Sequence, residues 1–258
     1  PLVRIRSLGS DTTRTNEFQM PLGDLLFDGE CIEYSAAREY FRRVPSDSWA
    51  AYVAGALIVL IREKDFCFSS GMNILLDSEV PEGKGVSSSA AIEVVSMTAI
   101  AAAFDVEINA RELAILCQKV ENLVVGAPCG IMDQMTSAAG EAGRFLSMVC
   151  RPAEVGESIA IPEGVEFWGI DSGIRHSVSG DDYGSVRTGA FMGYRMIAES
   201  AGFAVKHFAD GVVMIDDPEW HGYLANITPA EFERRFATKL PRAMSGKEFL
   251  AKFNGITD

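Results

Sequence analysis

The chain has 258 residues, of which 48% are apolar and 23% are charged, enough for one large domain or two modest ones around an ordinary core. Acidic residues outnumber basic ones by 36 to 23, and the net charge is -13. This surplus disfavours a nucleic-acid partner, which needs a basic surface to neutralise phosphates. The longest apolar run, residues 50–61, falls well short of the roughly 20 residues that span a bilayer. We therefore expect neither nucleic-acid binding nor membrane insertion.

The cysteines and histidines predict no structural metal or disulfide framework. The five cysteines include no C-x-x-C pair, and the three histidines form no H-E-x-x-H pattern. Free thiols are typical of a reducing compartment. We therefore expect a cytoplasmic protein, and we see no signal peptide.

Periodicity and capping residues predict a mixture of strands and helices. In chain order we expect a strand at 2–7, helices at 35–43 and 47–62, a strand at 65–77, and a helix at 88–104. A capping box at Asn109 opens the next helix, which should run to about Val125. Strands are expected at 143–150, 157–161 and 165–171, a helix at 183–201, and two helix starts at Thr228 and Ser245. The second helix is apolar on most faces, so we expect it to be buried.

The segment P-E-G-K-G-V-S-S-S-A, residues 81–90, has the composition of an anion cradle. Gly83 and Gly85 permit positive φ, so successive N–H groups can point into one concavity. The helix that follows adds its free amides and the positive end of its dipole. A serine that only caps the helix is the alternative interpretation.

A second motif follows at residues 118–134, Q-K-V-E-N-L-V-V-G-A-P-C-G-I-M-D-Q. Together with the glycine-serine segment it resembles the GHMP family of small-molecule kinases. Within that family the chain is similar to the galactokinase branch, and most of all to the L-arabinokinases, over nearly its full length. The segments W-A-A-Y-V-A-G and F-W-G-I-D-S-G-I-R-H-S-V also carry this resemblance.

The resemblance implies an ATP-dependent sugar kinase that phosphorylates the anomeric hydroxyl of a monosaccharide, with Mg²⁺ as the metal. It places the ATP phosphates in the loop formed by Gly83, Lys84, Gly85, Val86, Ser87, Ser88, Ser89 and Ala90. It makes Ser89 and Glu121 the metal ligands. It makes Asp133 the catalytic residue facing the sugar hydroxyl, either as a base or as an orienting group. Taken alone, without the resemblance, Asp133 is better interpreted as a helix-start aspartate, and Glu121 as a solvated charge on a helix.

The resemblance also places the sugar beside Asp133, Gly130 and Tyr183. The chain reads D-D-Y-G-S-V-R where galactokinases carry S-E-Y followed by adjacent arginines, and this departure favours L-arabinose, with L-arabinose 1-phosphate as product. D-galactose differs only by one hydroxymethyl group, so galactokinase activity is the alternative. A non-catalytic, galactokinase-like sensor of sugar and ATP is the alternative from another class. Arg175 and His176 fit a structural ion pair as well as a ligand contact.

The implied fold is α+β, a two-domain GHMP kinase. Residues 1–178 would form the N-terminal domain, of the type of ribosomal protein S5 domain 2, and 179–258 would begin a ferredoxin-like C-terminal domain. The family's first and third glycine-rich motifs do not occur in the sequence, so we expect a fragment truncated at both ends. Exposed apolar surface at the truncated edge is then expected, while the oligomeric state stays open.

Overall fold

The structure is a computed structural model that describes residues 1–9, 14–151, 153–174, 181–208 and 211–257, with the backbone alone for 181–183. The chain divides into two compact units, residues 1–178 and 179–258. Each unit is described by itself. That these units are the two domains named above stays a prediction.

The first unit contains a three-stranded sheet in the order β2-β1-β5. Strand β1 (Leu2–Ser7) pairs antiparallel with β2 (Glu17–Pro21) and parallel with β5 (Met72–Leu76). Alternate residues of β1 are buried, with Val3 and Ile5 in the core and Arg4 and Arg6 exposed. The period of two therefore marks one face of the sheet for burial.

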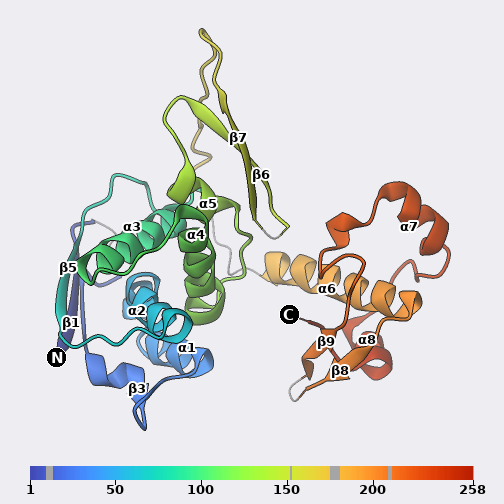
Figure 1. The fold of residues 1–258 in the computed structure, drawn as a ribbon, viewed down its shortest axis with the longest axis horizontal. Coiled ribbons are helices and arrows are strands. Elements are labelled where there is room, and N and C mark those ends of the chain that lie inside the picture. The colour runs from blue at the N-terminus through green and yellow to red at the C-terminus, as the bar shows by residue number, and fades with distance from the viewer. Residues whose placement is uncertain (10–13, 152, 175–180, 209–210, 258) are drawn as a thin grey trace. The chain divides into compact units, whose positions relative to one another are not determined.

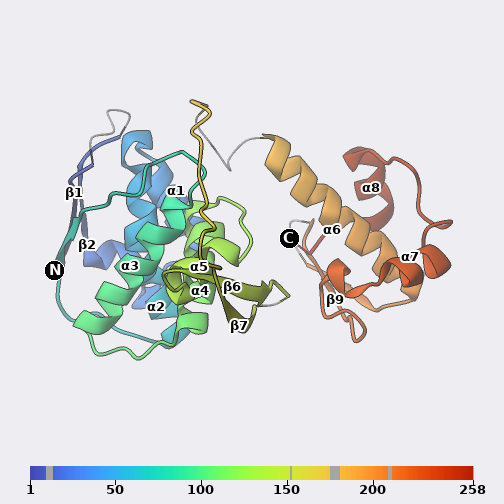
Figure 2. The ribbon, with the colours of Figure 1, turned by 90° about the horizontal axis from the view of Figure 1, so that it is seen from above.

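Helices of the first unit cover that apolar face of the sheet, as two perpendicular views show (Figures 1 and 2). The helical segments of this unit are α1 (Tyr34–Arg42), α2 (Ala51–Lys64), α3 (Ser88–Ala103), α4 (Ala110–Lys119), a π-turn (Val120–Val125) and α5 (Met132–Ala139), of which α5 packs on α3, α4 and β6 and not on the sheet. Two 3-10 turns (Leu22–Leu25 and Pro45–Ala50) and the short pair β3 (Leu26–Phe27) and β4 (Glu30–Cys31) complete this part. Residues 53–60 of α2 are all buried, which confirms the expectation of a central helix.

The end of α4 differs from an ordinary helix. Its start is confirmed, because the Asn109 side chain accepts a hydrogen bond from the Glu112 N–H at 3.0 Å. After Lys119 the chain widens into the π-turn, and Gly126 ends it with φ of 79°. A Cβ at Gly126 would lie within 3 Å of the Arg38 and Arg42 side chains, which could shift, so this position favours glycine chiefly for its positive φ.

A hairpin follows α5, made of β6 (Arg144–Val149) and β7 (Glu154–Ala160) (Figure 1). The prediction of a strand at 165–171 is wrong, because these described residues form no strand. Its apolar side chains are exposed, with Trp168 at 83% and Ile170 at 93%. In the same way, only 72–76 of the strand expected at 65–77 pairs with a neighbour. Both segments have strand composition, but a strand requires a partner for its backbone groups.

The second unit has a smaller core. It contains α6 (Asp181–Ala201), β8 (Val205–His207), β9 (Val213–Ile215), a 3-10 turn (Leu224–Asn226), α7 (Pro229–Arg235) and α8 (Gly246–Phe253). Tyr194 and Ile197 of α6 pack with Trp220 and Phe236. The helix starts expected at Thr228 and Ser245 are confirmed, and Ser245 forms a complete capping box with Glu248. None of the described helices is long and apolar enough to cross a membrane.

Candidate functional site

The glycine-serine loop has the backbone geometry that an anion cradle requires. Gly83 and Gly85 have φ of 68° and 71°, and Ser87 has φ of 60°, an uncommon value for a residue with a side chain. Helix α3 begins at the next residue, Ser88, and Ser87 gives it no side-chain cap. The N-terminal amides of α3 are therefore not satisfied by the residue that opens the helix, which is how anion-binding helix ends are built.

Ion pairs attach the loop to its surroundings at two points. At its base Glu82 pairs with Arg14, which also donates to the Ser7 hydroxyl at 3.0 Å and stacks 4.8 Å from the Trp49 ring. Near its tip Lys84 pairs with Asp171 at 2.8 Å, and both of these side chains are largely exposed. The base is thus held by a partly buried network, while the tip has an ion pair of the kind that contributes little stability.

Glu121 lies at the start of the π-turn and is only 3% exposed, so it is not a solvated surface charge. The Gln134 amide donates a hydrogen bond to its carboxylate at 2.6 Å, and the Ser89 hydroxyl and Cys129 thiol also interact with the carboxylate and favour its charged form. Burial raises the pKa of Glu121, and these three interactions oppose that rise. A π-turn often marks a functional residue, because it turns side chains away from the regular helical register.

The loop that carries Cys129 is fixed from behind by helix α4 and the π-turn. Asn122 accepts from the Cys129 N–H at 2.7 Å, and Gln118 donates to the Cys129 carbonyl at 3.1 Å. Burial and the nearby Glu121 raise the pKa of the thiol, so Cys129 remains a proton donor to the carboxylate.

Asp133 lies in the first turn of α5, half-buried, and its charge acts on Glu121 to raise the pKa of that carboxyl. Ser89, Glu121 and Asp133 come from three separate segments, and Glu121 interacts with both of the others. That these residues are the metal ligands and the catalytic residue stays a prediction. Gly130, in the same loop, is exposed and has open space around it.

Two residues of this cluster were not predicted from the sequence. Gln134 and Glu93 are both completely buried, and the Gln134 amide donates to Glu121 at 2.6 Å and to Glu93 at 3.1 Å. A signal for Glu93 was available, because it is the one charged residue in the otherwise small and apolar helix α3 and lies four residues after Ser89. Burial, followed by the charge of Glu121, raises the pKa of Glu93 well above the ordinary value.

The side chains present fit a magnesium ion. Mg²⁺ prefers a small number of protein oxygen ligands and takes the rest from water and substrate phosphates. Ser89 and Glu121 offer a hydroxyl and a carboxylate in mutual contact, next to the proposed phosphate cradle. Within the described ranges no group of three or more His, Cys, Asp or Glu side chains could hold a metal, so a site built from protein alone is not indicated.

The sugar end of the prediction falls largely outside the described residues. The backbone of Tyr183 belongs to α6, but its side chain is not described, and Arg175 and His176 lie in an undescribed segment. The segment 161–174 before them carries Asp171, the partner of Lys84.

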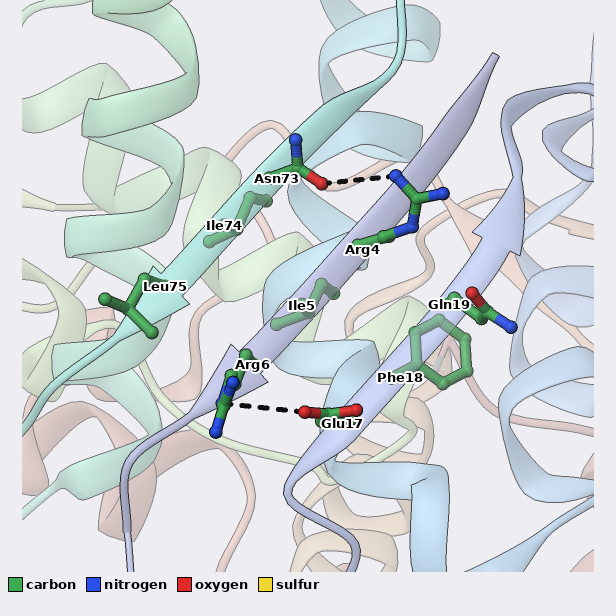
Figure 3. A pocket seen from close by; sticks show the side chains of 9 residues that line it. All are labelled: Arg4, Ile5, Arg6, Glu17, Phe18, Gln19, Asn73, Ile74 and Leu75. Atoms are coloured by element: carbon green, nitrogen blue, oxygen red, sulfur yellow. Dashed lines mark hydrogen bonds and ion pairs between the residues drawn. The ribbon is translucent and has the colours of Figure 1, made fainter.

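A pocket on the three-stranded sheet is separate from these residues (Figure 3). It lies among Arg4, Ile5, Arg6, Glu17, Phe18, Gln19, Asn73, Ile74 and Leu75. Arg4 contacts Asn73, and Arg6 contacts Glu17, both at 3.5 Å across neighbouring strands (Figure 3). None of the candidate site residues lines this pocket.

Comparison with known proteins places the chain in a family. Residues 51–141 match the model of the GHMP kinases N terminal domain. The L-arabinokinase of Arabidopsis thaliana is 48% identical over 98% of this chain and 26% of its own length. The galactokinase of Chloroflexus aggregans is 38% identical over 60% of this chain and 39% of its own length.

A solved structure agrees with these relatives. The galactokinase of Lactococcus lactis, complexed with galactose, matches 80% of this chain and 47% of its own with a TM-score of 0.57 at 19% identity, which confirms the expected α+β fold. The chain spans about a quarter to a half of these relatives. The family model, the relatives and the fold agree, and the chain belongs to the GHMP kinases.

Proposed function

We propose that the protein carrying this chain transfers the γ-phosphoryl group of ATP to the anomeric hydroxyl of a monosaccharide. The observation that carries the proposal is that Glu121 interacts both with Asp133 and with Ser89, and that Ser89 lies in the first turn of helix α3, directly after a loop with three positive φ angles. Phosphoryl transfer needs charge neutralisation and an aligned nucleophile more than covalent chemistry, and this arrangement supplies both kinds of group.

Each residue has a distinct role in the proposed reaction. The backbone of Gly83–Ala90 and the amides of α3 bind the phosphates, and Lys84 adds a positive charge at the tip of the loop. Ser89 and Glu121 hold Mg²⁺, which when bound neutralises charge on the phosphates. Asp133 accepts a hydrogen bond from the sugar hydroxyl and orients it toward the phosphorus. It takes the proton as the hydroxyl attacks, or only polarises the O–H bond.

L-arabinose is the proposed sugar, and D-galactose the alternative. The similarity to L-arabinokinase over nearly the whole chain, at 48% identity, favours L-arabinose. The galactokinases cover less of the chain, but they too are sugar kinases by name. The two sugars differ by one hydroxymethyl group, so a steric change worth roughly 1–3 kcal/mol separates them.

A sensor that binds sugar and ATP without catalysis is the alternative from another class. The interaction of Glu121 with both Ser89 and Asp133 favours the enzyme. We also propose a cytoplasmic location, because all five cysteines are free thiols in the structure.

A coupled ADP-release assay on the chain extended to the length of its relatives tests the proposal. The assay compares L-arabinose with D-galactose in the presence of Mg²⁺ and ATP, with Asp133→Asn as the control. We expect turnover on L-arabinose that the substitution abolishes. Saturable sugar binding without ADP release would contradict the kinase and support the sensor.

A further inference from the structure

The carboxamide of Gln134 lies between two buried carboxylates. Its Nε2 atom is 2.6 Å from Glu121 Oε2 and 3.1 Å from Glu93 Oε2, and 3.6 Å from the Cys129 sulfur. Gln134, Glu93 and Glu121 are 0%, 0% and 3% exposed. The contact with Glu121 fixes the orientation of the amide, since the amide oxygen would be repelled by that carboxylate.

These hydrogen bonds link three helical segments in series. Glu93 comes from α3, Gln134 from α5 and Glu121 from the π-turn. The outer oxygens, Glu93 Oε1 and Gln134 Oε1, have no hydrogen-bond partner and are buried. Three polar side chains in a fully buried position are costly to keep, and such clusters are retained where they hold a functional group in place.

A neutral amide is suited to holding a carboxylate that must stay available to a cation. A lysine or arginine in this position would also bind Glu121, but it would cancel the negative charge that attracts a metal. The carboxamide donates a hydrogen bond, limits rotation of the carboxylate and leaves its charge in place. Mutation of a partner that orients a metal ligand in this way typically weakens metal binding by about 10–100-fold.

We propose that Gln134 is a positioning residue for Glu121, and that Glu93 acts through Gln134 by anchoring its amide. The inference rests on the proposed function, because it gives Glu121 the role of metal ligand. Neither residue touches the substrate. Their contribution is to hold the Glu121 carboxylate toward Ser89, which binds the same carboxylate from the head of α3.

The test measures Mn²⁺ binding by electron paramagnetic resonance in the full-length protein, with a non-hydrolysable ATP analogue present. The variants are Gln134→Met, Glu93→Met and Glu93→Gln. Methionine keeps the volume and the unbranched shape but removes the hydrogen bond. Glutamine at position 93 keeps an oxygen that can accept from Gln134. The control is Ser96→Ala, which alters a buried hydroxyl of the same helix that has no hydrogen-bond partner.

We expect the two methionine variants to bind Mn²⁺ about 10–100-fold more weakly, the range found for partners of metal ligands. Glu93→Gln and Ser96→Ala should bind as the wild type does. The KM for the sugar should not change in any variant. Thermal unfolding checks that each variant folds, and if Gln134→Met does not, the Glu93 pair decides the question alone.

Unchanged Mn²⁺ affinity in a folded Gln134→Met or Glu93→Met variant would overturn the inference. An equal loss in Glu93→Met and Ser96→Ala would also overturn it, because disturbed packing of α3 would then explain the effect. If the wild type itself binds neither Mn²⁺ nor the ATP analogue, the proposed function fails first, and this outcome differs from both of the others.

Discussion

The glycine-serine loop and the buried carboxylate cluster are adjacent parts of one candidate site, yet they are built in opposite ways. The loop presents backbone amides, with an exposed ion pair at its tip and Val86 53% exposed. The cluster presents side chains that are almost wholly buried, drawn from α3, the π-turn and α5. Binding by the loop should therefore depend on backbone conformation, and binding by the cluster on hydrogen bonds within the core.

This difference predicts which substitutions should have large effects on binding and stability. Backbone groups cannot be removed by mutation, and exposed charges are screened by water and salt. A buried carboxylate that loses its partner, in contrast, is left with an uncompensated cost. We expect large effects from the cluster and small ones from the tip of the loop.

The largest effect should come from the two carboxylates themselves. Asp133→Asn removes the group that addresses the sugar hydroxyl, and we expect kcat to fall by about 10²–10⁴-fold with sugar binding retained. Glu121→Gln should instead raise the Mg²⁺ concentration needed for half-maximal rate. Steady-state kinetics at several Mg²⁺ concentrations distinguishes the fall in kcat from the raised Mg²⁺ requirement. The division of roles would be refuted if both variants showed the same Mg²⁺ dependence.

The next largest effect should come from a substitution that disturbs the packing of α2 against the π-turn. A Cβ at Gly55 would lie 2.7 Å from Val120 Cγ1 and 3.3 Å from Val124, so Gly55→Ala must displace the turn that carries Glu121. We expect a loss of about 1–3 kcal/mol in the free energy of unfolding, together with weaker metal binding.

Gly193→Ala is the matched control, because this glycine of α6 has open space around its Cβ position. There the better helix propensity of alanine should stabilise the protein by about 0.5–1 kcal/mol. Urea denaturation measures both changes. A stabilising effect at position 55 would mean that the π-turn adapts freely and does not fix Glu121.

The pH dependence of stability should follow the buried Glu93. Its pKa is raised in the folded protein by burial and by the charge of Glu121, so folding favours the protonated form. The contribution of Glu93 to the free energy of unfolding is complete below the ordinary glutamate pKa of about 4.3. It is lost as the pH rises through the raised pKa of the folded protein. Glu93→Gln mimics the protonated acid and should remove this loss.

Denaturation of wild type and Glu93→Gln at pH 5 and pH 8 measures this effect. The variant should gain stability relative to the wild type at the higher pH. Glu121 remains in both proteins, and its own raised pKa changes the stability of both with pH in the same direction. A relative gain at the lower pH would reverse the predicted sign and contradict the burial argument.

The smallest effect should come from the tip of the loop. Asp171→Asn releases Lys84 from an exposed ion pair, so ATP should bind slightly more tightly, by at most about fivefold at low salt. Lys84→Met should weaken ATP binding by a similar factor. Both differences should shrink at high salt. Calorimetric titration with ATP at two ionic strengths measures them, and an effect that persists in high salt would show that the tip is not an exposed electrostatic site.

The sequence predicted the loop better than the cluster, for a physical reason. Gly83, Gly85 and the helix start at Ser88 are local features, and their positive φ angles and boundary are confirmed. The bridge from Glu93 through Gln134 to Glu121 joins residues that are 41 and 13 positions apart, and it exists only once three helices have packed. The strand expected at 165–171 failed for the same reason, because strand composition does not provide a pairing partner.

The most direct test of the account is phosphorus magnetic resonance of the full-length protein with Mg²⁺, ATP and L-arabinose. The account predicts a new phosphate resonance coupled to the anomeric proton of the sugar, growing as the ATP signals change to those of ADP, and absent with Asp133→Asn. ATP that stays intact while the sugar binds would contradict the account, and so would a phosphate on any other hydroxyl.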